Sequence, residues 1–557
     1  MSQSYIPRIS VRLALSLALL TASSAIIPQS LAADVAANTN IPQLSSNAVK
    51  VADYAVAKYD AAMVQSLAEL VSFNTQAVEG QTPDTNPAFV GFKSSLQQLS
   101  QTLGLDYVDH GYVILIGLDA TSSSTGEPKK LGVVTHGDVQ PANPALWAQS
   151  PYLLDSQSEP GKLIGRGTED DKGAIVTAMY AMKAIKDKQI KRDRRIELLV
   201  YLAEESDWEP LQTFLTHYTP ADMNITIDAE YPVVTAEKGW SKIAFTVPNI
   251  TISNIDAKAE AATQTPTLTA FSGGYFASQV PQQAEAQIEA VSPALLAKLQ
   301  TKAAAQQGMK YRFENHCVDS LCKLHIFADG KAAHSSTPED GVNAVTHLAA
   351  LLSNNLSHDL SNDLSNEQIH APWPQTAASL TVAVINELVG LGIYAEQFGD
   401  LAYKDDFMGP LTLAPTVVSE TQKGTEVIIN LRRPVGKTPE LLTKQAREAL
   451  TLWQDKHQVQ LVDIESYWGE PMVMEGAPQQ QTLLDVFAHF TGIVDPKPVA
   501  IGGSTNSKLF PNALSFGPAM PGVEYTGHTE KEFITHKQFM LNLKMYTAAF
   551  IELSAVK

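Results

Sequence analysis

The sequence predicts an α/β protein whose chain is interrupted by an inserted α+β domain. Between residues 51 and 237, short apolar β-type runs alternate with helical segments, which is typical of a parallel or mixed sheet covered by helices. From 238 to 465 the predicted strands are separated by longer polar or Ala/Gln-rich stretches, such as 277–307. The first pattern resumes from 466 to 557. We therefore expect 51–237 and 466–557 to form one domain, with 238–465 inserted into it.

Hydrophobic periodicity places the main elements. It predicts helices over 55–71, 173–186, 481–491 and 536–553. It predicts strands over 130–134 and 196–203 in the first domain and over 242–247, 321–328 and 426–432 in the inserted one. In an open α/β sheet the carboxyl ends of the strands are where sites are built, so the residues that follow each strand are the first to examine.

Length and composition are those of a soluble multidomain protein. The chain has 557 residues, more than one small hydrophobic core supports, so at least two domains are expected. Its 44% hydrophobic and 18% charged residues are ordinary for a globular protein. The formal net charge of −19 argues against nucleic acid or an anionic membrane as a partner.

The N-terminal segment has the features of a secretory signal. Arg8 and Arg12 precede a mainly apolar stretch, 13–27, and a small-x-small pattern ends at Ala32. The apolar stretch is shorter than the roughly 20 residues that a spanning helix needs, which argues against a retained anchor. We expect residues 1–32 to be removed, 33–50 to form a mobile leader, and the mature protein to be exported, most simply to a bacterial periplasm, with no membrane anchor.

The sequence contains two cysteines, Cys317 and Cys322. Their spacing suits a disulfide across a short turn, and an oxidising compartment would permit it. The alternative is a pair of reduced thiols on a strand and a loop. No neighbouring base indicates a catalytic cysteine.

A histidine and an aspartate follow the strand 130–134. His136 and Asp138 lie two residues apart in a turn at the carboxyl end of that strand. Asp138 could accept a hydrogen bond from the His136 ring and so fix the tautomer for metal ligation. Taken alone, the pattern favours a structural turn histidine.

Two acidic segments follow in the sequence, one directly before the helix 173–186 and one at the end of the strand 196–203. Residues 165–173 read Gly-Arg-Gly-Thr-Glu-Asp-Asp-Lys-Gly, and helix capping explains one of these three acids but not all of them. Glu204 and Glu205 end the strand 196–203, so their side chains should diverge, one toward a metal and the other toward a reacting water. A solvated loop is the alternative for that pair.

Further acidic and histidine ligands complete a metal-binding pattern. Asp228 ends another apolar strand-like run, and His528 lies near the C-terminus. Nitrogen and oxygen ligands without cysteine suit zinc, manganese or cobalt. Two such ions that share a carboxylate and a water would activate the water for hydrolysis. We therefore expect two divalent ions, zinc first among them.

Five motifs follow one another in a characteristic order: His-Gly-Asp-Val, Gly-Arg-Gly-Thr-Glu-Asp-Asp-Lys-Gly, Ala-Glu-Glu-Ser, Asp-Ala-Glu-Tyr-Pro and the late Gly-His-Thr-Glu-Lys-Glu. In this order they resemble the M20 family of co-catalytic metallopeptidases, and within it the PepV-type dipeptidases. The resemblance covers nearly all of the chain after the leader. It implies a di-metal hydrolase domain with an inserted lid domain and cleavage of dipeptides or short peptides. The implied metal ligands are His136 with Asp228, Glu205 with His528, and Asp170 as the bridge.

The resemblance also assigns catalytic and substrate-binding roles. Asp138 would orient His136, and Glu204 would be the general base. In the lid, His334 would reach the active site and stabilise the oxyanion, and Arg432 would bind the substrate carboxylate through its planar fork. Without the resemblance, a surface histidine and an edge-strand arginine would be preferred for the last two.

Three positions depart from the family pattern, and they put the specificity in doubt. They are Ser278 in place of an asparagine, Ser504 in place of a glycine, and Lys508 in place of an arginine. The large lid implies a monomer, because it would supply in one chain what a dimer partner supplies elsewhere. Two alternative functions are an M20-like deacylase or carboxypeptidase acting on N-acyl amino acids, and a non-catalytic periplasmic peptide-binding protein.

Overall fold

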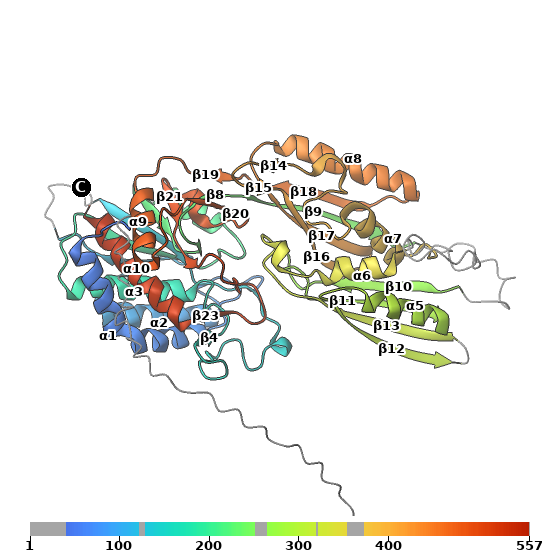
Figure 1. Ribbon diagram of the computed structural model, residues 1–557, viewed down its shortest axis with the longest axis horizontal. Helices are drawn as coiled ribbons and strands as arrows, with labels where there is room; N and C mark the ends of the chain where they lie inside the picture. Colours follow the sequence, from blue (N-terminus) through green and yellow to red (C-terminus); the bar gives the residue numbers. More distant parts are fainter. Residues whose placement is uncertain (1–40, 122–128, 251–264, 319–320, 354–372, 556–557) are drawn as a thin grey trace, which may run out of the picture. The chain divides into compact units, whose positions relative to one another are not determined.

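The computed structural model describes most of the chain (Figure 1). The described residues are 41–121, 129–250, 265–318, 321–353 and 373–555. The predicted signal segment 1–32 and residues 33–40 of the predicted leader lie outside them. No helix within the described ranges is long and apolar enough to cross a membrane.

Helix α1 (Ser46–Val71) starts earlier than the sequence predicts. Its first residues fall in the segment 33–50, so the prediction of a mobile leader is wrong for residues 46–50. The Ser45 side chain caps the helix by accepting a hydrogen bond from the Ala48 main-chain N–H at 3.2 Å. Ala48, Val51 and Ala52 are buried, which gives this first part of the helix a packed face.

The first sheet is mixed and has helices on its faces. Among the described residues its strands, in spatial order, are β1 (Asp106–Asp109), β2 (Val113–Leu118), β5 (Arg195–Tyr201), β3 (Lys130–His136), β6 (Asn224–Thr226), β21 (Ala513–Ser515), β8 (Val234–Glu237) and β19 (Met472–Val473), with β20 (Val499–Ile501) beside β8. Strands β5, β3 and β6 run parallel, whereas β2 is antiparallel to β5. The three parallel strands therefore end at one edge of the sheet.

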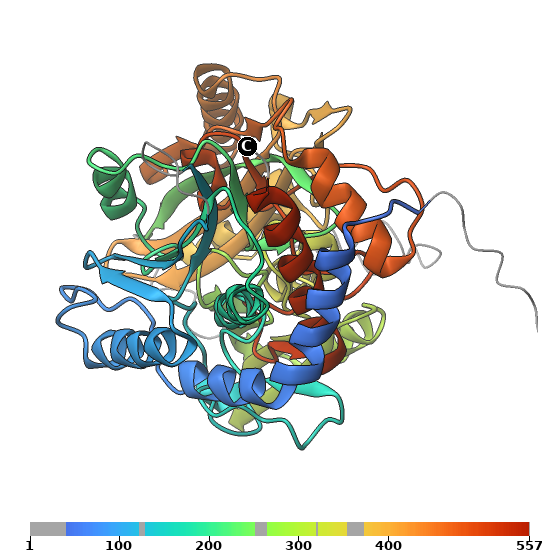
Figure 2. The ribbon, with the colours of Figure 1, turned by 90° about the vertical axis from the view of Figure 1, so that its left-hand side faces the viewer.

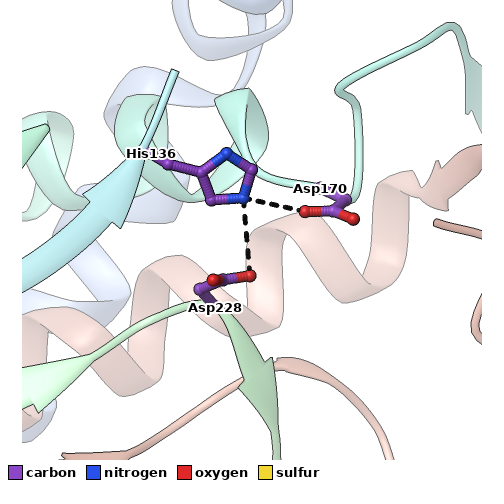
Figure 3. Close-up of side chains that lie close together, drawn as sticks. All are labelled: His136, Asp170 and Asp228. Carbon is purple, nitrogen blue, oxygen red and sulfur yellow. Dashed lines mark hydrogen bonds and ion pairs between the residues drawn. The ribbon is translucent and has the colours of Figure 1, made fainter. Parts of the chain in front are cut away.

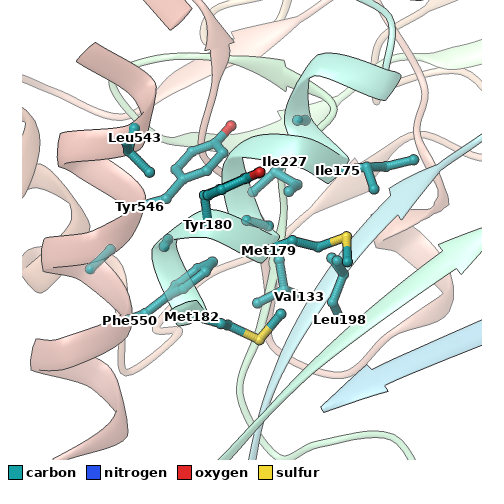
Figure 4. Close-up of a cluster of buried hydrophobic side chains, with 14 of the residues drawn as sticks. Val133, Ile175, Met179, Tyr180, Met182, Leu198, Ile227, Leu543, Tyr546 and Phe550 are labelled. Carbon is teal, nitrogen blue, oxygen red and sulfur yellow. The ribbon is translucent and has the colours of Figure 1, made fainter. Parts of the chain in front are cut away.

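Apolar side chains on both faces explain why the central strands are almost uniformly hydrophobic. On one face, Val133 of β3 and Leu198 of β5 belong to the same hydrophobic cluster as Met179 and residues of helix α10 (His536–Ser554), as Figure 4 shows. Met179 belongs to α3 (Lys172–Asp187). Residues of alternating position on the same strands contact Leu211 on the other face. Strands buried on two faces lose the alternating pattern of half-exposed strands.

Several helices complete this domain. They are α1, α2 (Pro87–Leu103), α3, α4 (Glu209–Leu215), α9 (Gln480–Thr491) and α10. Figure 2 shows α1, α3 and α10 side by side, and these three helices contact one another. The elements come from both ends of the described chain, so the two predicted parts of the first domain share one hydrophobic core.

The second sheet carries the predicted lid. Its strands within the described residues, in spatial order, are β12 (Lys310–Val318), β13 (Leu321–Asp329), β11 (Gln283–Val291), β10 (Thr267–Gly273), β16 (Thr412–Glu420), β17 (Gly424–Arg433), β9 (Gly239–Pro248) and β18 (Val462–Trp468). All the pairings in this sheet are antiparallel. Its helices are α5 (Pro293–Ala304), α6 (Ala344–Leu352), α7 (Ala377–Val384) and α8 (Pro439–His457).

Two details of the lid differ from the sequence-based expectation. The stretch 277–307, which reads as a polar separator, contains β11 and α5. Its alternation of Ala and Ile with Gln and Glu is the pattern of a half-exposed strand, and Ala284, Ala286 and Ile288 are buried while Glu285 is exposed. Strand β18 also continues past the expected boundary at 465.

The hairpin of β12 and β13 contains the disulfide. Cys317 and Cys322 face each other across the antiparallel pair and are joined, with a sequence separation of 5. The predicted disulfide is therefore confirmed. Three further two-strand sheets are present among the described residues: β14 (Lys404–Asp405) with β15 (Gly409–Pro410), β22 (Pro518–Ala519) with β7 (Ala229–Glu230), and β23 (Phe533–Thr535) with β4 (Lys162–Ile164).

Candidate active site and metal centre

The predicted site residues meet at the carboxyl edge of the first sheet. His136 is the last residue of β3, Asp228 follows β6, and Glu204 and Glu205 follow β5. These strands are neighbours and run parallel, so their ends converge. Asp170 arrives from the loop before α3.

The first group of ligand atoms joins a histidine and two aspartates. His136 Nε2 lies 2.9 Å from Asp170 Oδ1 and 3.6 Å from Asp228 Oδ1, as Figure 3 shows. The potential ligand atoms of this group all lie within 4.8 Å of one another. His136 and Asp170 are buried, and Asp228 is half-buried.

A second group shares Asp170 with the first. His528 Nε2 lies 2.8 Å from Glu205 Oε1 and 3.0 Å from Asp170 Oδ2. The two oxygens of Asp170 therefore point to different histidines. Among the described residues, a third compatible cluster combines His136 with Glu204 and Glu205. One carboxylate between two donor groups is the arrangement that a pair of ions requires.

Asp138 differs from the prediction in how it contacts His136. The closest partner of His136 Nδ1 is the Asp138 main-chain oxygen at 3.1 Å, and the carboxylate lies 3.5 Å away. A ring N–H donated to the carbonyl leaves the lone pair on Nε2, where a metal would bind. The Asp138 carboxylate accepts hydrogen bonds from the main-chain N–H groups of Glu204 and Glu205, each at 3.0 Å.

The acids of the loop before α3 do not cap the helix through their side chains. Asp171 occupies the N-cap position without a side-chain cap hydrogen bond and contacts the Thr135 hydroxyl instead, so the capping interpretation is wrong. Glu169 accepts two hydrogen bonds from Thr526, each at 2.8 Å. All three acids therefore face inward, where the site is built.

Buried carboxylates dominate the electrostatics of this edge. Burial raises the pKa of Asp228 to about 6. Burial and then the Asp228 carboxylate raise the pKa of Glu204 well above its usual range. Burial favours neutral His528, but the Glu205 and Asp170 carboxylates outweigh it and raise the pKa of His528 to about 10. Carboxylates held this close together repel one another when ionised, and bound cations would relieve that repulsion.

The donor set fits divalent cations. Two imidazole nitrogens and several carboxylate oxygens, without thiolate, suit zinc, manganese or cobalt. His528 Nδ1 is buried and has no hydrogen-bond partner within the described chain, while its Nε2 faces the carboxylates. A neutral ring with its proton on Nδ1 would present the Nε2 lone pair to a cation.

The lid completes a cleft of about 1390 Å³ over these residues. The ring of His334 lies 4.4 Å from that of His528, measured between centroids. Gln279 of the lid donates a hydrogen bond to the His528 main-chain oxygen at 2.8 Å. Arg432 at the end of β17 lines the same cleft. The structure thus brings both predicted lid residues to the cleft that contains the ligand clusters.

His334 is arranged as a neutral hydrogen-bond donor. The Ser336 main-chain N–H donates to His334 Nδ1 at 3.2 Å, so Nδ1 is the acceptor and a neutral ring carries its proton on Nε2. Burial, followed by the charges of His528 and Arg432, lowers the pKa of His334 well below its usual range.

Arg432 is a buried cation without a carboxylate partner among the described residues. Its guanidinium donates to Asn430 Oδ1 at 3.2 Å and to the Ser335 hydroxyl at 3.1 Å. Burial lowers the pKa of Arg432 to about 10, against the attraction of Glu204 and Glu205. A buried guanidinium bonded only to neutral groups is suited to bind an anion.

Sequence reasoning missed residues that support the ligands. The Tyr525 hydroxyl donates to Asp170 Oδ2 at 2.8 Å, and Gln140 Nε2 donates to Glu205 Oε2 at 2.7 Å. Both residues lie close in sequence to predicted ligands, and this proximity is the feature of the sequence from which their supporting contacts could have been predicted. All three residues that depart from the family pattern line the cleft: Ser278, Ser504 and Lys508.

Comparison with known proteins decides the family. The model of peptidase family M20/M25/M40 matches residues 132–552. The chain belongs to this family. It is 28% identical over 438 residues to the Beta-Ala-Xaa dipeptidase of Lactobacillus delbrueckii subsp. lactis, a match that covers 76% of this chain and 82% of that relative.

Two solved structures share the fold. Human carnosine dipeptidase 1 matches with a TM-score of 0.56 and 15% identity, covering 92% of this chain and 100% of the other. The dipeptidase Dug1p of Saccharomyces cerevisiae matches with a TM-score of 0.53 and 12% identity, covering 92% and 100%.

These findings confirm three predictions. The protein is an M20 peptidase, it has the α/β fold with a lid, and it is an enzyme rather than a non-catalytic binding protein. M20 peptidases depend on metal, and the His, Asp and Glu clusters of this chain are consistent with that dependence.

Proposed function

We propose that this M20 peptidase is an exported dipeptidase that hydrolyses dipeptides or short peptides with two divalent cations, zinc first among them. The observation that carries the proposal is the pair of donor groups joined by Asp170, beneath a lid that presents His334 and Arg432 to the same cleft. The relatives in the comparison that are named dipeptidases support the substrate class.

Each side chain has a proposed role. One cation would be held by His136 and Asp228 and the other by Glu205 and His528, with Asp170 shared. When bound, such a pair of cations polarises the scissile carbonyl and makes water a better nucleophile near neutral pH. Asp138 contributes by fixing the His136 ring and, through its carboxylate, the main chain of the two glutamates.

The proton and the substrate are handled by protein groups. Glu204 takes the proton of the attacking water and delivers it to the leaving amine, a role that suits a carboxylate whose pKa is raised by burial. His334 donates Nε2–H to the oxygen that becomes negative in the transition state. Arg432 binds the carboxylate of the substrate's C-terminal residue.

Metal removal tests this function. Dialysis against a chelator should abolish hydrolysis of a dipeptide such as alanyl-alanine, and zinc, manganese or cobalt should restore it. The metal content of the active protein, measured by elemental analysis, should approach two ions per chain. Full activity in a preparation shown to be metal-free would refute the mechanism.

Export and the monomeric state belong to the same proposal. Export is supported by the signal-like sequence of residues 1–32 and by the Cys317–Cys322 disulfide, which is typical of oxidising compartments. The first residue of the protein purified from its native cell should be Ala33, and an N-terminal Met1 would contradict processing. A monomer is supported because the chain's own His334 reaches His528.

A further inference from the structure

Glu230 is a second carboxylate close in the chain to Asp228. It belongs to the short strand β7, two residues after Asp228. Both residues line the cleft, and Glu230 is half-buried there. Ala519, its partner on β22, brings no polar side chain to it.

The Glu230 carboxylate has no partner within the described part of the chain. None of the described residues makes a hydrogen bond or an ion pair to it, and it is absent from the three clusters of potential metal ligands found among them. Glu524, another carboxylate of the same cleft, is exposed and lies 2.8 Å from Lys331 Nζ. Partial burial of an unpaired carboxylate is unfavourable, so Glu230 is suited to a cation that arrives with the substrate.

We propose that Glu230 binds the free α-ammonium group of the substrate's N-terminal residue. The inference rests on the proposed peptidase function and deepens it. A dipeptide carries a positive charge at one end and a negative charge at the other, and the cleft offers Glu230 for the first and Arg432 for the second. An N-acyl amino acid has no ammonium group and would leave Glu230 unpaired and further desolvated. The residue therefore selects dipeptides over N-acyl amino acids.

Two substrates that differ only in the amino group test the assignment. Alanyl-alanine and propionyl-alanine have the same carbon skeleton, and the ratio of their kcat/KM values measures the contribution of the ammonium group. Because the two carbonyls also differ in reactivity, the comparison is made between enzymes. Glu230→Gln keeps the shape and removes the charge, so the ratio should fall at least about tenfold, through a loss on alanyl-alanine.

Two controls separate recognition from structure. Glu524→Gln removes a carboxylate of the same cleft that is already paired with Lys331, and it should leave the ratio at the wild-type value. The metal content of Glu230→Gln should equal that of the wild type, because Glu230 lies outside the ligand clusters.

The outcomes are distinguishable. A wild-type enzyme that cleaves alanyl-alanine, with an unchanged ratio in Glu230→Gln, overturns the role of Glu230 and leaves the dipeptidase intact. Loss of metal in that variant also overturns it, because Glu230 would then be a ligand. A wild-type enzyme that is loaded with metal and cleaves only propionyl-alanine overturns the dipeptidase assignment and this inference together.

Discussion

At the scale of single residues, the adjacent glutamates Glu204 and Glu205 show how neighbours in sequence can have different surroundings. The Glu205 carboxylate contacts His528 at 2.8 Å and accepts from Gln140 at 2.7 Å, so both of its oxygens have partners. No side-chain hydrogen bond within the described residues involves the Glu204 carboxylate, although its main-chain N–H is fixed by Asp138. A carboxylate that lines the cleft without a partner is free to exchange a proton.

This difference predicts different defects for the two glutamine variants. Glu204→Gln should keep its metal ions and lose roughly 10²–10⁴-fold in kcat, the usual contribution of a general base. Glu205→Gln should bind one of the ions more weakly, because it removes a charged ligand. Elemental analysis and steady-state kinetics of both variants give the answer, and the opposite pattern would exchange their roles.

The sequence predicts that the candidate ligands lie at one edge of a sheet, and they do, but their individual contacts could not be predicted. Acids and histidines directly after apolar strands mark the carboxyl edge of a sheet, which is a local signal. The hydrogen bond between the His136 ring and the Asp138 main-chain oxygen depends on the path of the turn, and no residue type encodes that path. Tyr525 reaches Asp170 from 355 positions away in the chain, a pairing that only the tertiary fold creates.

At the scale of elements, the loop that carries Asp170 is held from outside. Glu532 is fully buried and accepts hydrogen bonds from the main-chain N–H groups of Gly167, Glu169 and Asp170, at 2.9–3.0 Å. It also forms an ion pair with Arg166 at 2.9 Å. One side chain thus fixes the main chain on both sides of residue 169 and with it the position of Asp170.

We therefore expect Glu532→Gln to weaken metal binding although Glu532 is not a ligand. Removing the charge leaves the buried Arg166 without its ion-pair partner and loosens the loop, and supporting residues of this kind typically contribute about 10–100-fold to metal affinity or activity. Glu530→Gln is the matched control, because Glu530 accepts from Trp147 at 2.5 Å and supports a different loop. Equal metal affinity in the two variants, measured by competition with a chelator, would contradict the role of Glu532.

Element boundaries were predictable where hydrophobic periodicity is strong. Helix α3 extends one residue beyond the predicted 173–186 at each end, and β3 continues two residues past the predicted 130–134. The prediction fails where the apolar residues are small. Strand β11 buries Ala284 and Ala286, and alanine favours helices and is depleted in strands.

At the scale of the whole molecule, the two domains bring their charges together in one cleft. The catalytic edge carries the carboxylates, and the lid brings the cation Arg432 and the neutral His334. Gly502 allows the close approach, because a Cβ there would lie 2.3 Å from the Ser336 main-chain oxygen of the lid. The insertion was visible in the sequence as a change of pattern, but this contact between distant loops was not.

The position of Arg432 leads to a prediction about the substrate's carboxylate. Arg432→Ala should lose two to three decades in kcat/KM. The substrate's carboxylate would be left unpaired in a buried site, which costs about 3–5 kcal/mol. The variant should keep its metal content, since Arg432 is outside the ligand clusters. Arg432→Lys should be intermediate, because it keeps the charge without the two-pronged geometry.

The dipeptide amide supplies the other half of this test. Alanyl-alanine amide lacks the negative charge, so the wild-type enzyme should cleave it poorly, and Arg432→Ala should add little further loss. The two changes remove the same interaction, and their effects should therefore be far from additive. If the wild-type enzyme cleaves the amide as fast as the free acid, Arg432 does not bind the carboxylate. The buried guanidinium would then act within the lid, through the hydrogen bonds that it already makes to Asn430 and Ser335.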